Sequence, residues 1–220
     1  MLYIVSTQIG NLEDITLRAL RTLKEVDYIA AEDTRHTQIL LNKYEIKTPT
    51  TSFHSYSSND KLEKIVGLLK EGKNIALVSD AGTPGISDPA YSLIRRALDE
   101  KISIVPIPGA SSLLAALVVS GLPMDKFVYL GFLPLKKGRQ TLLKSLKDES
   151  RTLVIFESPH RLIRTLNDLK ESLGDREIAV GRELTKIFEE IVREKISSVI
   201  EYFEKKKPKG EFVLVVKGSN

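Results

Sequence analysis

Two loops rich in small residues carry the clearest chemical signal in the chain. One is the segment 80–88, Asp-Ala-Gly-Thr-Pro-Gly-Ile-Ser-Asp, and the other is 108–112, Pro-Gly-Ala-Ser-Ser. Small residues let a ligand approach the backbone closely, and prolines stiffen a loop. The first loop is longer than the ~2–6 residues that usually join a strand to a helix. Because neither loop contains Lys or Arg and the chain lacks a Gly-Lys-Ser/Thr motif, the loops favour a cofactor held by backbone amides and one carboxylate over a phosphate ligand, with inert turns as the alternative.

Charged side chains gather in three other segments, which are 32–35 (Glu-Asp-Thr-Arg), 157–161 (Glu-Ser-Pro-His-Arg) and 182–186 (Arg-Glu-Leu-Thr-Lys). The first opens a predicted helix, and the other two follow predicted strands. The charges of 182–186 form either a surface ion-pair group, worth ~0–1 kcal/mol, or part of a site. His160 either begins a helix or takes part in chemistry. No metal site is expected, because the three histidines stand far apart and the chain has no Cys.

Secondary-structure patterns indicate which elements position these segments. Apolar runs rich in Val, Ile and Tyr alternate with segments of helical period, which predicts a parallel sheet with helices on its faces. Leucines spaced from Leu17 to Leu23 predict a first helix with Asp14 as its N-cap, and similar spacings predict helices over 62–69 and 93–98. The strands are expected at 2–6, 27–32, 74–79, 102–106, 127–131, 152–156, 177–182, 188–193 and 211–217.

The pattern changes after about residue 120, where a Ser-Gly-Leu-Pro break occupies 120–123. Beyond it, two strands flank a predicted helix over 196–207, which is typical of a mixed sheet. The fold class is therefore expected to be α/β, with two α/β domains over 1–120 and 121–220. The first is expected to have a mostly parallel sheet and to carry the cofactor loops.

Composition bounds the class of protein further. Of the 220 residues, 42% are hydrophobic and 28% are charged, which is typical of a globular chain rather than a disordered one. The N-terminus has no basic segment before an apolar stretch, and no apolar run approaches the ~20 residues of a membrane span. A cytoplasmic protein without a membrane segment is expected.

The distribution of charge points to a partner. Residues 1–120 carry 13 Lys and Arg against 14 Asp and Glu, a net of −1, whereas residues 121–220 carry 20 against 15, a net of +5. A single cluster of basic residues is usually a solvated face. The asymmetry between the halves nevertheless favours a polyanion that docks on the second half.

Together these segments resemble the tetrapyrrole methylase superfamily, the class III S-adenosylmethionine-dependent methyltransferases. Within that superfamily the chain is similar to the ribosomal RNA small subunit methyltransferase I family. The resemblance follows the family's order over nearly the whole chain, and its twelve-residue stretch 78–89 is highly specific. The matching stretches are 10–16, 31–35, 78–89, 108–111, 131–134, 156–161, 182–186 and 210–211.

The resemblance implies a two-domain homodimer that binds S-adenosylmethionine in the cleft between its domains. The basic second domain would complete this cleft and contact RNA. The cofactor contacts implied by position are Asp80, Ala81, Gly82, Ile86, Ser87, Gly109, Ala110, Ser111 and Ser112, with parts of 131–133, 182–186 and 210–211.

The implied reaction is 2′-O-methylation of the ribose of a cytidine in the decoding region of 16S rRNA, presented as free rRNA or as the small ribosomal subunit. A sulfonium methyl donor is already activated, so alignment of the reacting groups can supply ~7–11 kcal/mol, and a base near the ribose hydroxyl should help. The candidate bases are Asp33, Glu183 and Lys186, the lysine only if burial lowers its pKa. The candidate RNA contacts are Arg35, Lys136, Lys137, Arg139, Arg161 and Arg182.

Three positions depart from the family pattern. Gln8 stands where Pro is usual, Ala90 stands where Gly is usual, and 54–59 lacks the usual His-x-x-Asn-Glu. Two other functions compete with the rRNA enzyme. A methylase of tetrapyrrole precursors would favour several aromatic residues near its site, but aromatic residues make up only 6% of this chain and Trp is absent. A non-catalytic RNA-binding assembly protein would have no need of a small-residue cofactor site.

Overall fold

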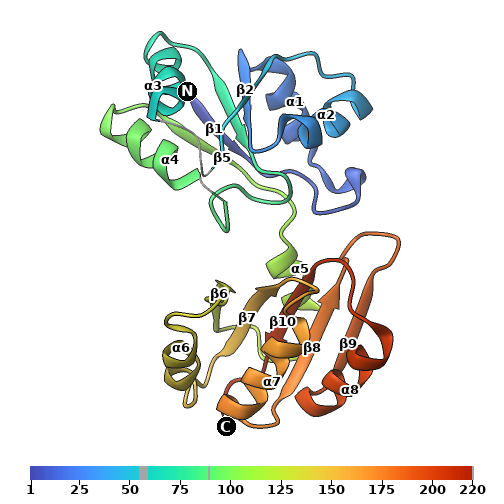
Figure 1. Cartoon of the computed structure of the whole chain (residues 1–220). Helices are drawn as coiled ribbons and strands as arrows, with labels where there is room; N and C mark the ends of the chain where they lie inside the picture. Colours follow the sequence, from blue (N-terminus) through green and yellow to red (C-terminus); the bar gives the residue numbers. More distant parts are fainter. Residues whose placement is uncertain (55–58, 89, 220) are drawn as a thin grey trace. The chain divides into compact units, whose positions relative to one another are not determined.

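The computed structural model describes residues 1–54, 59–88 and 90–219, and the chain divides into two compact units, Met1–Ser111 and Ser112–Asn220. Each unit contains its own five-stranded sheet (Figure 1). One sheet is parallel and the other is mixed, which confirms the expected α/β class. Within the described part of the chain, no helix has both the length and the apolar character needed to cross a membrane.

The sheet of the first unit has the strand order β3-β2-β4-β1-β5, and every described pair is parallel. Four of its strands were expected from their apolar runs. The fifth, β3, was missed because its Thr-Thr-Ser sequence has no apolar alternation, and it pairs only with β2 at the sheet edge. The strands are β1 (Leu2–Val5), β2 (Tyr28–Ala31), β3 (Thr50–Ser52), β4 (Ile75–Val78) and β5 (Ile104–Ile107).

Helices cover both faces of this sheet. The helices α1 (Leu17–Glu25) and α2 (Thr34–Lys43) pack into the core of one face, whereas α3 (Asn59–Lys70) and α4 (Ala90–Asp99) pack into the core of the other. The chain therefore leaves β1 towards β2 over one face and leaves β4 towards β5 over the opposite face. This reversal makes the carboxyl ends of β1 and β4 the topological switch point of the sheet, where open α/β sheets bind ligands.

The start of α1 differs from its prediction. Thr16, not Asp14, is the N-cap, because its side chain accepts a hydrogen bond from the Ala19 N–H, while Asp14 ends a short 3-10 helix, η1 (Leu12–Asp14). Leu17 is 86% exposed, although Leu23 is fully buried as expected. The buried stripe of α1 consists of Ala19, Thr22 and Leu23, so Leu17 is left in solvent.

The sheet of the second unit has the order β6-β7-β10-β8-β9. β6 is parallel to β7, β10 is antiparallel to β7 and β8, and β9 is antiparallel to β8. The carboxyl ends of β6, β7 and β8 therefore meet the amino ends of β9 and β10 at one edge. The strands are β6 (Phe127–Phe132), β7 (Thr152–Glu157), β8 (Glu177–Arg182), β9 (Glu190–Lys195) and β10 (Phe212–Val216).

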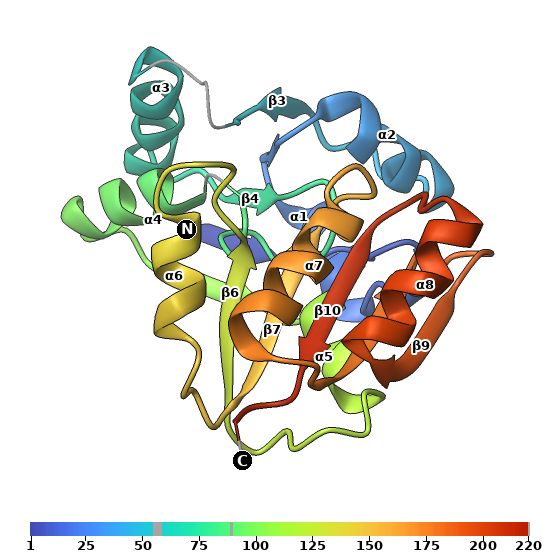
Figure 2. The ribbon, with the colours of Figure 1, turned by 60° about the horizontal axis from the view of Figure 1, so that its bottom comes forward.

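Three helices, α6 (Arg139–Ser145), α7 (Leu162–Leu173) and α8 (Ile196–Lys206), share one hydrophobic core with a face of this sheet (Figure 2). The helix α5 (Ser112–Val118) contacts β7, β8 and β10. By these contacts α5 belongs to the second unit, ahead of the boundary expected at 120/121. The reason is that its apolar residues are buried against the second sheet, which the local sequence does not reveal.

Candidate functional site

The loops that follow β1 and β4 are joined to each other at the switch point of the first sheet. The Thr7 N–H donates a hydrogen bond to the Gly82 carbonyl at 2.9 Å, and the Gly82 N–H donates to the Gln8 carbonyl at 3.1 Å. The Ser6 and Thr83 hydroxyl oxygens lie 2.8 Å apart. These bonds make the two loops one structural piece at the edge where a ligand is expected.

The loop after β5 packs on this piece through a glycine. A Cβ on Gly109 would lie 2.8 Å from the Ser6 Cβ and 3.2 Å from the Ser6 carbonyl oxygen, so a side chain there would push the loops apart. Gly82 has a φ of +77°, a conformation that glycine adopts without strain. Of the cofactor candidates, Ala81, Ile86, Ser87 and Gly109 are exposed, Asp80, Ala110, Ser111 and Ser112 are half-buried, and Gly82 is buried.

Gln8, in the loop that follows β1, carries a buried side-chain oxygen. Its side chain is 7% exposed, and its Oε1 has no hydrogen-bond partner among the described residues. A buried acceptor without a donor costs ~1–3 kcal/mol, so such an atom in a native fold calls for a donor from outside the chain. The cofactor implied by the resemblance carries ammonium, amine and hydroxyl donors. Any of these groups could donate the hydrogen bond that Gln8 Oε1 lacks, so this residue fits that cofactor.

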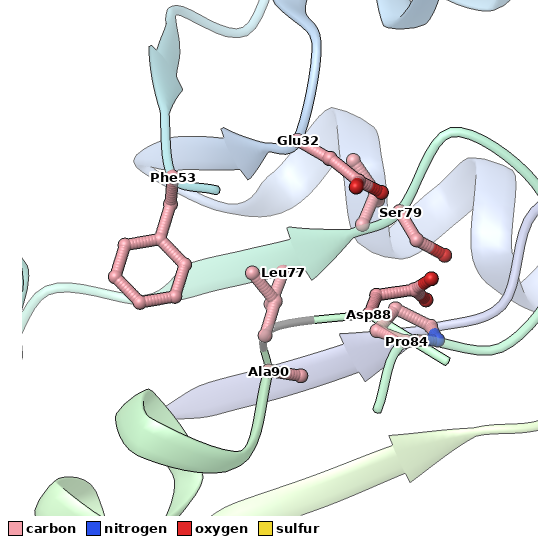
Figure 3. A pocket seen from close by; sticks show the side chains of 8 residues that line it. Glu32, Phe53, Leu77, Ser79, Pro84, Asp88 and Ala90 are labelled. Atoms are coloured by element: carbon pink, nitrogen blue, oxygen red, sulfur yellow. The ribbon is translucent and has the colours of Figure 1, made fainter. Parts of the chain in front are cut away.

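A small pocket lies beside the 80–88 loop, and Figure 3 shows its three polar side chains on the same side as Pro84, with Phe53, Leu77 and Ala90 on the other side. Its volume is about 10 Å³, which is room for a single water molecule. This is below the ~300–1,000 Å³ of typical ligand pockets, so the pocket alone does not hold a cofactor. The lining residues are Glu32, Phe53, Leu77, Val78, Ser79, Pro84, Asp88 and Ala90.

The two carboxyl groups that line this pocket, those of Asp88 and Glu32, both have raised pKa values. Burial raises the pKa of Asp88, although interactions with Ser79 and with the Gly85 N–H oppose that rise. Burial also raises the pKa of Glu32, and the nearby Asp88 and Asp80 charges add to that rise. Asp88 therefore fastens the 80–88 loop at its start and its middle. The following Pro89 lies outside the described residues, as does most of the departing segment 54–59.

Asp33, a candidate base, is tied to Arg35 and to the cofactor loop. It caps α2 by accepting the Arg35 N–H at 2.9 Å, and its Oδ2 lies 2.9 Å from Nη2 of the same arginine. Its own N–H donates to Oδ1 of Asp80 at 3.0 Å. The hydrogen bonds from Arg35 lower the pKa of Asp33 to about 2. Asp33 is thus ionised at neutral pH but only weakly basic, while Arg35 keeps an exposed guanidinium.

Glu183 and Lys186, the other candidate bases, lie in one closed turn at the edge of the second sheet. Lys186 Nζ donates to Glu183 Oε1 at 3.0 Å and to Glu211 Oε2 at 2.9 Å, and the Glu211 N–H donates to the same Glu183 oxygen at 2.9 Å. Glu183 has a φ of +47°, which is strained for a non-glycine residue. Gly210 has a φ of +89°, which favours glycine, and a Cβ there would lie 2.6 Å from Glu183 Oε1, so the Glu183 side chain would have to move.

This turn holds its groups in their charged forms. Desolvation opposes ionisation of Glu183, but hydrogen bonds from the Glu211 N–H and from Lys186 lower the pKa of Glu183 below its usual value. Desolvation also opposes the charge of Lys186, yet its two carboxylate partners raise the pKa of Lys186. The lowered pKa that a lysine base requires is therefore not found at Lys186.

The arginines expected to contact RNA differ in what they touch. Arg139 is only 2% exposed and pairs with Asp168 at 2.7 Å, so the structure places it in the interior of the second unit, where it is unavailable to RNA. Arg182 donates to the Lys209 carbonyl at 2.7 Å and pairs with Glu190 at 3.4 Å. The sequence does not distinguish the buried Arg139 and the half-buried Arg182 from exposed cations, because the local pattern of charge is the same for both.

The lysines of the same basic segment behave differently. Lys136 and Lys137 are exposed, and neither side chain has an ion-pair or hydrogen-bond partner among the described residues. Arg161 is half-buried and pairs with the fully buried Glu157 at 3.3 Å. His160 is exposed. In the part of the chain that the structure describes, no group of three or more His, Asp or Glu side chains could hold a metal ion.

Three functional candidates escaped sequence reasoning. Glu32 and Asp88 lay inside recognised segments, but nothing local distinguished their carboxyl groups, whose pKa values are raised, from those of Asp33 and Asp80. Gln8 was noticed only as a departure from the family pattern. Its buried, unpartnered oxygen gives that departure a physical meaning.

The fold and the family of the chain are established by comparison with known proteins. Residues 1–200 match the family of Tetrapyrrole (Corrin/Porphyrin) Methylases. A solved diphthine synthase is similar with a TM-score of 0.78 at 14% identity, over 99% of this chain and 89% of that chain. A cobalt precorrin-4 methyltransferase is similar with a TM-score of 0.73 at 17% identity, over 98% and 94%. The chain belongs to the family of Tetrapyrrole (Corrin/Porphyrin) Methylases, and the two solved structures show the shared fold.

Closer relatives define the family within this class. The chain is 55% identical to the ribosomal RNA small subunit methyltransferase I of Thermotoga maritima, over 99% of this chain and 98% of the relative. It is 51% identical to the enzyme of the same name from Bacillus subtilis, over 100% of this chain and 76% of the relative. The chain belongs to the ribosomal RNA small subunit methyltransferase I family, which confirms the family expected from its motifs.

Proposed function

We propose that this protein transfers a methyl group from S-adenosylmethionine to the 2′-hydroxyl of a cytidine ribose in the decoding region of 16S rRNA. The observation that carries this proposal is the 55% identity to a ribosomal RNA small subunit methyltransferase I over nearly the full length of both chains. The joined loops at the switch point support it. We further propose that the enzyme acts as a cytoplasmic homodimer on free rRNA or on the small ribosomal subunit.

S-adenosylmethionine supplies an activated methyl group when it is bound. The residues that would hold it belong to the three joined loops of the first unit. The Asp80 carboxylate and the Gln8 Oε1 offer acceptors, while Ala81, Ser87 and Gly109 offer a surface that a ligand can approach closely. Because the loops are already fixed by their own hydrogen bonds, binding would cost little additional ordering.

The proposed proton acceptor is one of two carboxylates. Asp33 and Glu183 are both ionised at neutral pH, but each has a lowered pKa and is therefore a weak base. Lys186 is protonated and would act as a positive charge rather than as a base. Alignment of methyl donor and hydroxyl would then supply the larger part of the acceleration, on the order of 7–11 kcal/mol.

A small tetrapyrrole substrate remains the competing chemistry within the same fold. The exposed, unpartnered Lys136 and Lys137 favour a long polyanion, because each can bind a separate phosphate. A non-catalytic role is disfavoured by the close loop packing that only a glycine at 109 permits.

The test is incubation of the protein with labelled S-adenosylmethionine and small ribosomal subunits, or their free rRNA, followed by mapping of the labelled nucleotide. The expected result is a 2′-O-methylated cytidine in the decoding region. Label in a base, in another RNA or in neither substrate would refute the proposed reaction, and label in a tetrapyrrole precursor would support the competing one.

The base is tested separately at saturating cofactor with Asp33→Asn, Glu183→Gln and Lys186→Met. General-base catalysis typically contributes ~10²–10⁴-fold to the rate. Replacement of the carboxylate that takes the proton should therefore lower kcat by at least ~10²-fold. Glu32→Gln belongs in the same series, because burial makes Glu32 the more basic neighbour of Asp33. If all four variants keep wild-type turnover, the general-base step is to be abandoned.

A further inference from the structure

A β-bulge sets the direction of Phe132 at the end of β6. Tyr129 pairs with Val154 on β7, but the next pairs are Gly131 with Ile155 and Phe132 with Phe156, so one extra residue interrupts β6. Gly131 adopts the positive φ of +61° at this point. Without the extra residue, Phe132 would face the helical core, as Ile155 does. The bulge instead turns it to the same face as Phe156.

On that face, Phe132 is held in place but not covered. Its ring packs edge-to-face on Phe156 with the centroids 5.8 Å apart, and the ring of Tyr129 also packs edge-to-face on Phe156, at 5.2 Å. Phe132 nevertheless remains 54% exposed. A fixed, exposed aromatic ring is the feature on which proteins stack unpaired bases of single-stranded nucleic acid.

Two arginine side chains form hydrogen bonds with the backbone of the loop that follows Phe132. Arg161 Nη2 donates to the Leu133 carbonyl at 2.5 Å, and Arg139 Nη1 donates to the Pro134 carbonyl at 3.2 Å. Both bonds fix the backbone just before the exposed Lys136.

These two arginines are themselves held by a buried network. Arg139 donates to Asp168 Oδ2 at 2.7 Å and to the Thr165 hydroxyl oxygen at 2.8 Å, and that hydroxyl donates to Glu157 Oε2 at 2.5 Å. Glu157 is also the partner of Arg161. The loop is therefore rigid before any ligand arrives, which lowers the ordering cost of binding.

We propose that Phe132, Lys136 and Lys137 form the surface on which an unpaired nucleotide of the RNA substrate docks. Its base stacks on the Phe132 ring, and the flanking phosphates contact the two lysines. This rests on the proposed function and narrows it to single-stranded RNA, because a base inside an A-form helix has no free face to stack. The lysines supply affinity that depends on salt, whereas the ring supplies affinity that does not.

The first test measures binding of unmethylated small ribosomal subunits by filter retention over a range of salt concentrations. Phe132→Ala should weaken binding by about 5- to 100-fold without changing the salt dependence, as expected for the loss of one stacked base. Phe132→Tyr keeps a ring and should stay within about twofold of wild type. Phe188→Ala is the matched control, because Phe188 is also exposed, at 68%, but lies between β8 and β9.

The second test distinguishes a specific role of Lys136 and Lys137 from an effect of the overall positive charge of the second unit. The double variant Lys136→Ser/Lys137→Ser should lower the slope of log affinity against log salt by about 1.4, since each phosphate contact on a single strand contributes about 0.7. The control is Lys205→Ser/Lys207→Ser, which removes two exposed lysines at the end of α8 and should leave the slope unchanged.

Two results would overturn the proposal. One is a Phe132→Ala variant that binds subunits within twofold of wild type. The other is a loss of S-adenosylmethionine affinity in that variant, measured by calorimetry, because Phe132 would then make the cofactor contact that the family resemblance implies for parts of 131–133. Failure of the proposed function looks different, since wild-type protein itself would then neither bind nor methylate the subunits.

Discussion

The carboxyl edges of the two sheets are built from opposite chemistry. At the first edge, backbone groups of small residues form hydrogen bonds with one another through Gly82, and half-buried carboxylates such as Asp88 have raised pKa values. At the second edge, long charged side chains form ion pairs, and Glu183 has a lowered pKa. The contrast teaches that small residues shape a surface through the backbone, whereas charged residues do so through fixed side-chain pairs.

The largest effect is expected where the second unit buries its charge. Arg139→Met leaves Asp168 without its buried partner and should lower the free energy of unfolding by about 3–5 kcal/mol, measured by urea denaturation. Arg164→Met is the matched control. Arg164 lies 3.9 Å from the same Asp168 oxygen but is largely exposed, so its loss should cost no more than about 1 kcal/mol. Equal losses in the two variants would contradict the assignment of Arg139 to the interior.

Disturbing the backbone packing at the first edge should lower both the affinity for the cofactor and the stability of the protein. Gly109→Ala forces a methyl group against Ser6 and should weaken S-adenosylmethionine binding by more than about tenfold, with about 1–3 kcal/mol of lost stability from overpacking. The binding is measured by calorimetry. In Gly67→Ala the new methyl group points into open space within α3, so this control should keep full affinity and gain about 0.5–1 kcal/mol of stability. Unchanged cofactor affinity in Gly109→Ala would place the cofactor elsewhere.

A smaller effect should follow from removal of the unpartnered acceptor at the first edge. Gln8→Leu deletes the buried Oε1, so the affinity for S-adenosylmethionine should fall by about 2- to 10-fold, the size of one hydrogen bond. The thermal midpoint without cofactor should not fall, since no partner in the described chain is lost. Gln140→Leu, at an exposed position of α6, serves as the control and should change neither quantity. Full cofactor affinity in Gln8→Leu would remove Gln8 from the site.

The smallest effect concerns pH. A fall in pH should change the contributions of the carboxyl groups at the two edges to the free energy of unfolding in opposite directions. A raised pKa, as in Glu32 and Asp88, adds stability that is present below the unfolded pKa and lost as pH rises through the folded pKa. A lowered pKa, as in Glu183 and Glu190, adds stability above the unfolded pKa that is lost as pH falls through the folded pKa. Carboxyl NMR should show that Glu32 and Asp88 titrate above the usual pKa values of their side chains, and that Glu183 titrates below its usual pKa. The reverse order would contradict the comparison.

Most of the fold followed from local patterns, because apolar runs and helical spacings report directly on which backbone is buried. The exceptions were places where local pattern and burial part company. The edge strand Thr50–Ser52 has no apolar alternation, and Leu17 is apolar yet exposed. The start of α5 within the second unit also depended on contacts with strands far along the chain.

The sequence by itself determined the family, the parallel and mixed sheets, and the loops 80–88 and 108–112 as the expected place of a cofactor. These depend on residue types and their order, which the chain carries locally. Only the tertiary structure decided which charges are free. Lys136, Lys137 and Arg139 look alike in sequence, but the start of α6 buries Arg139 against α7 and leaves the lysines in solvent. Long-range packing likewise gave Gln8 its unpartnered oxygen and Phe132 its open face, because burial is a property of the assembled unit and not of any segment.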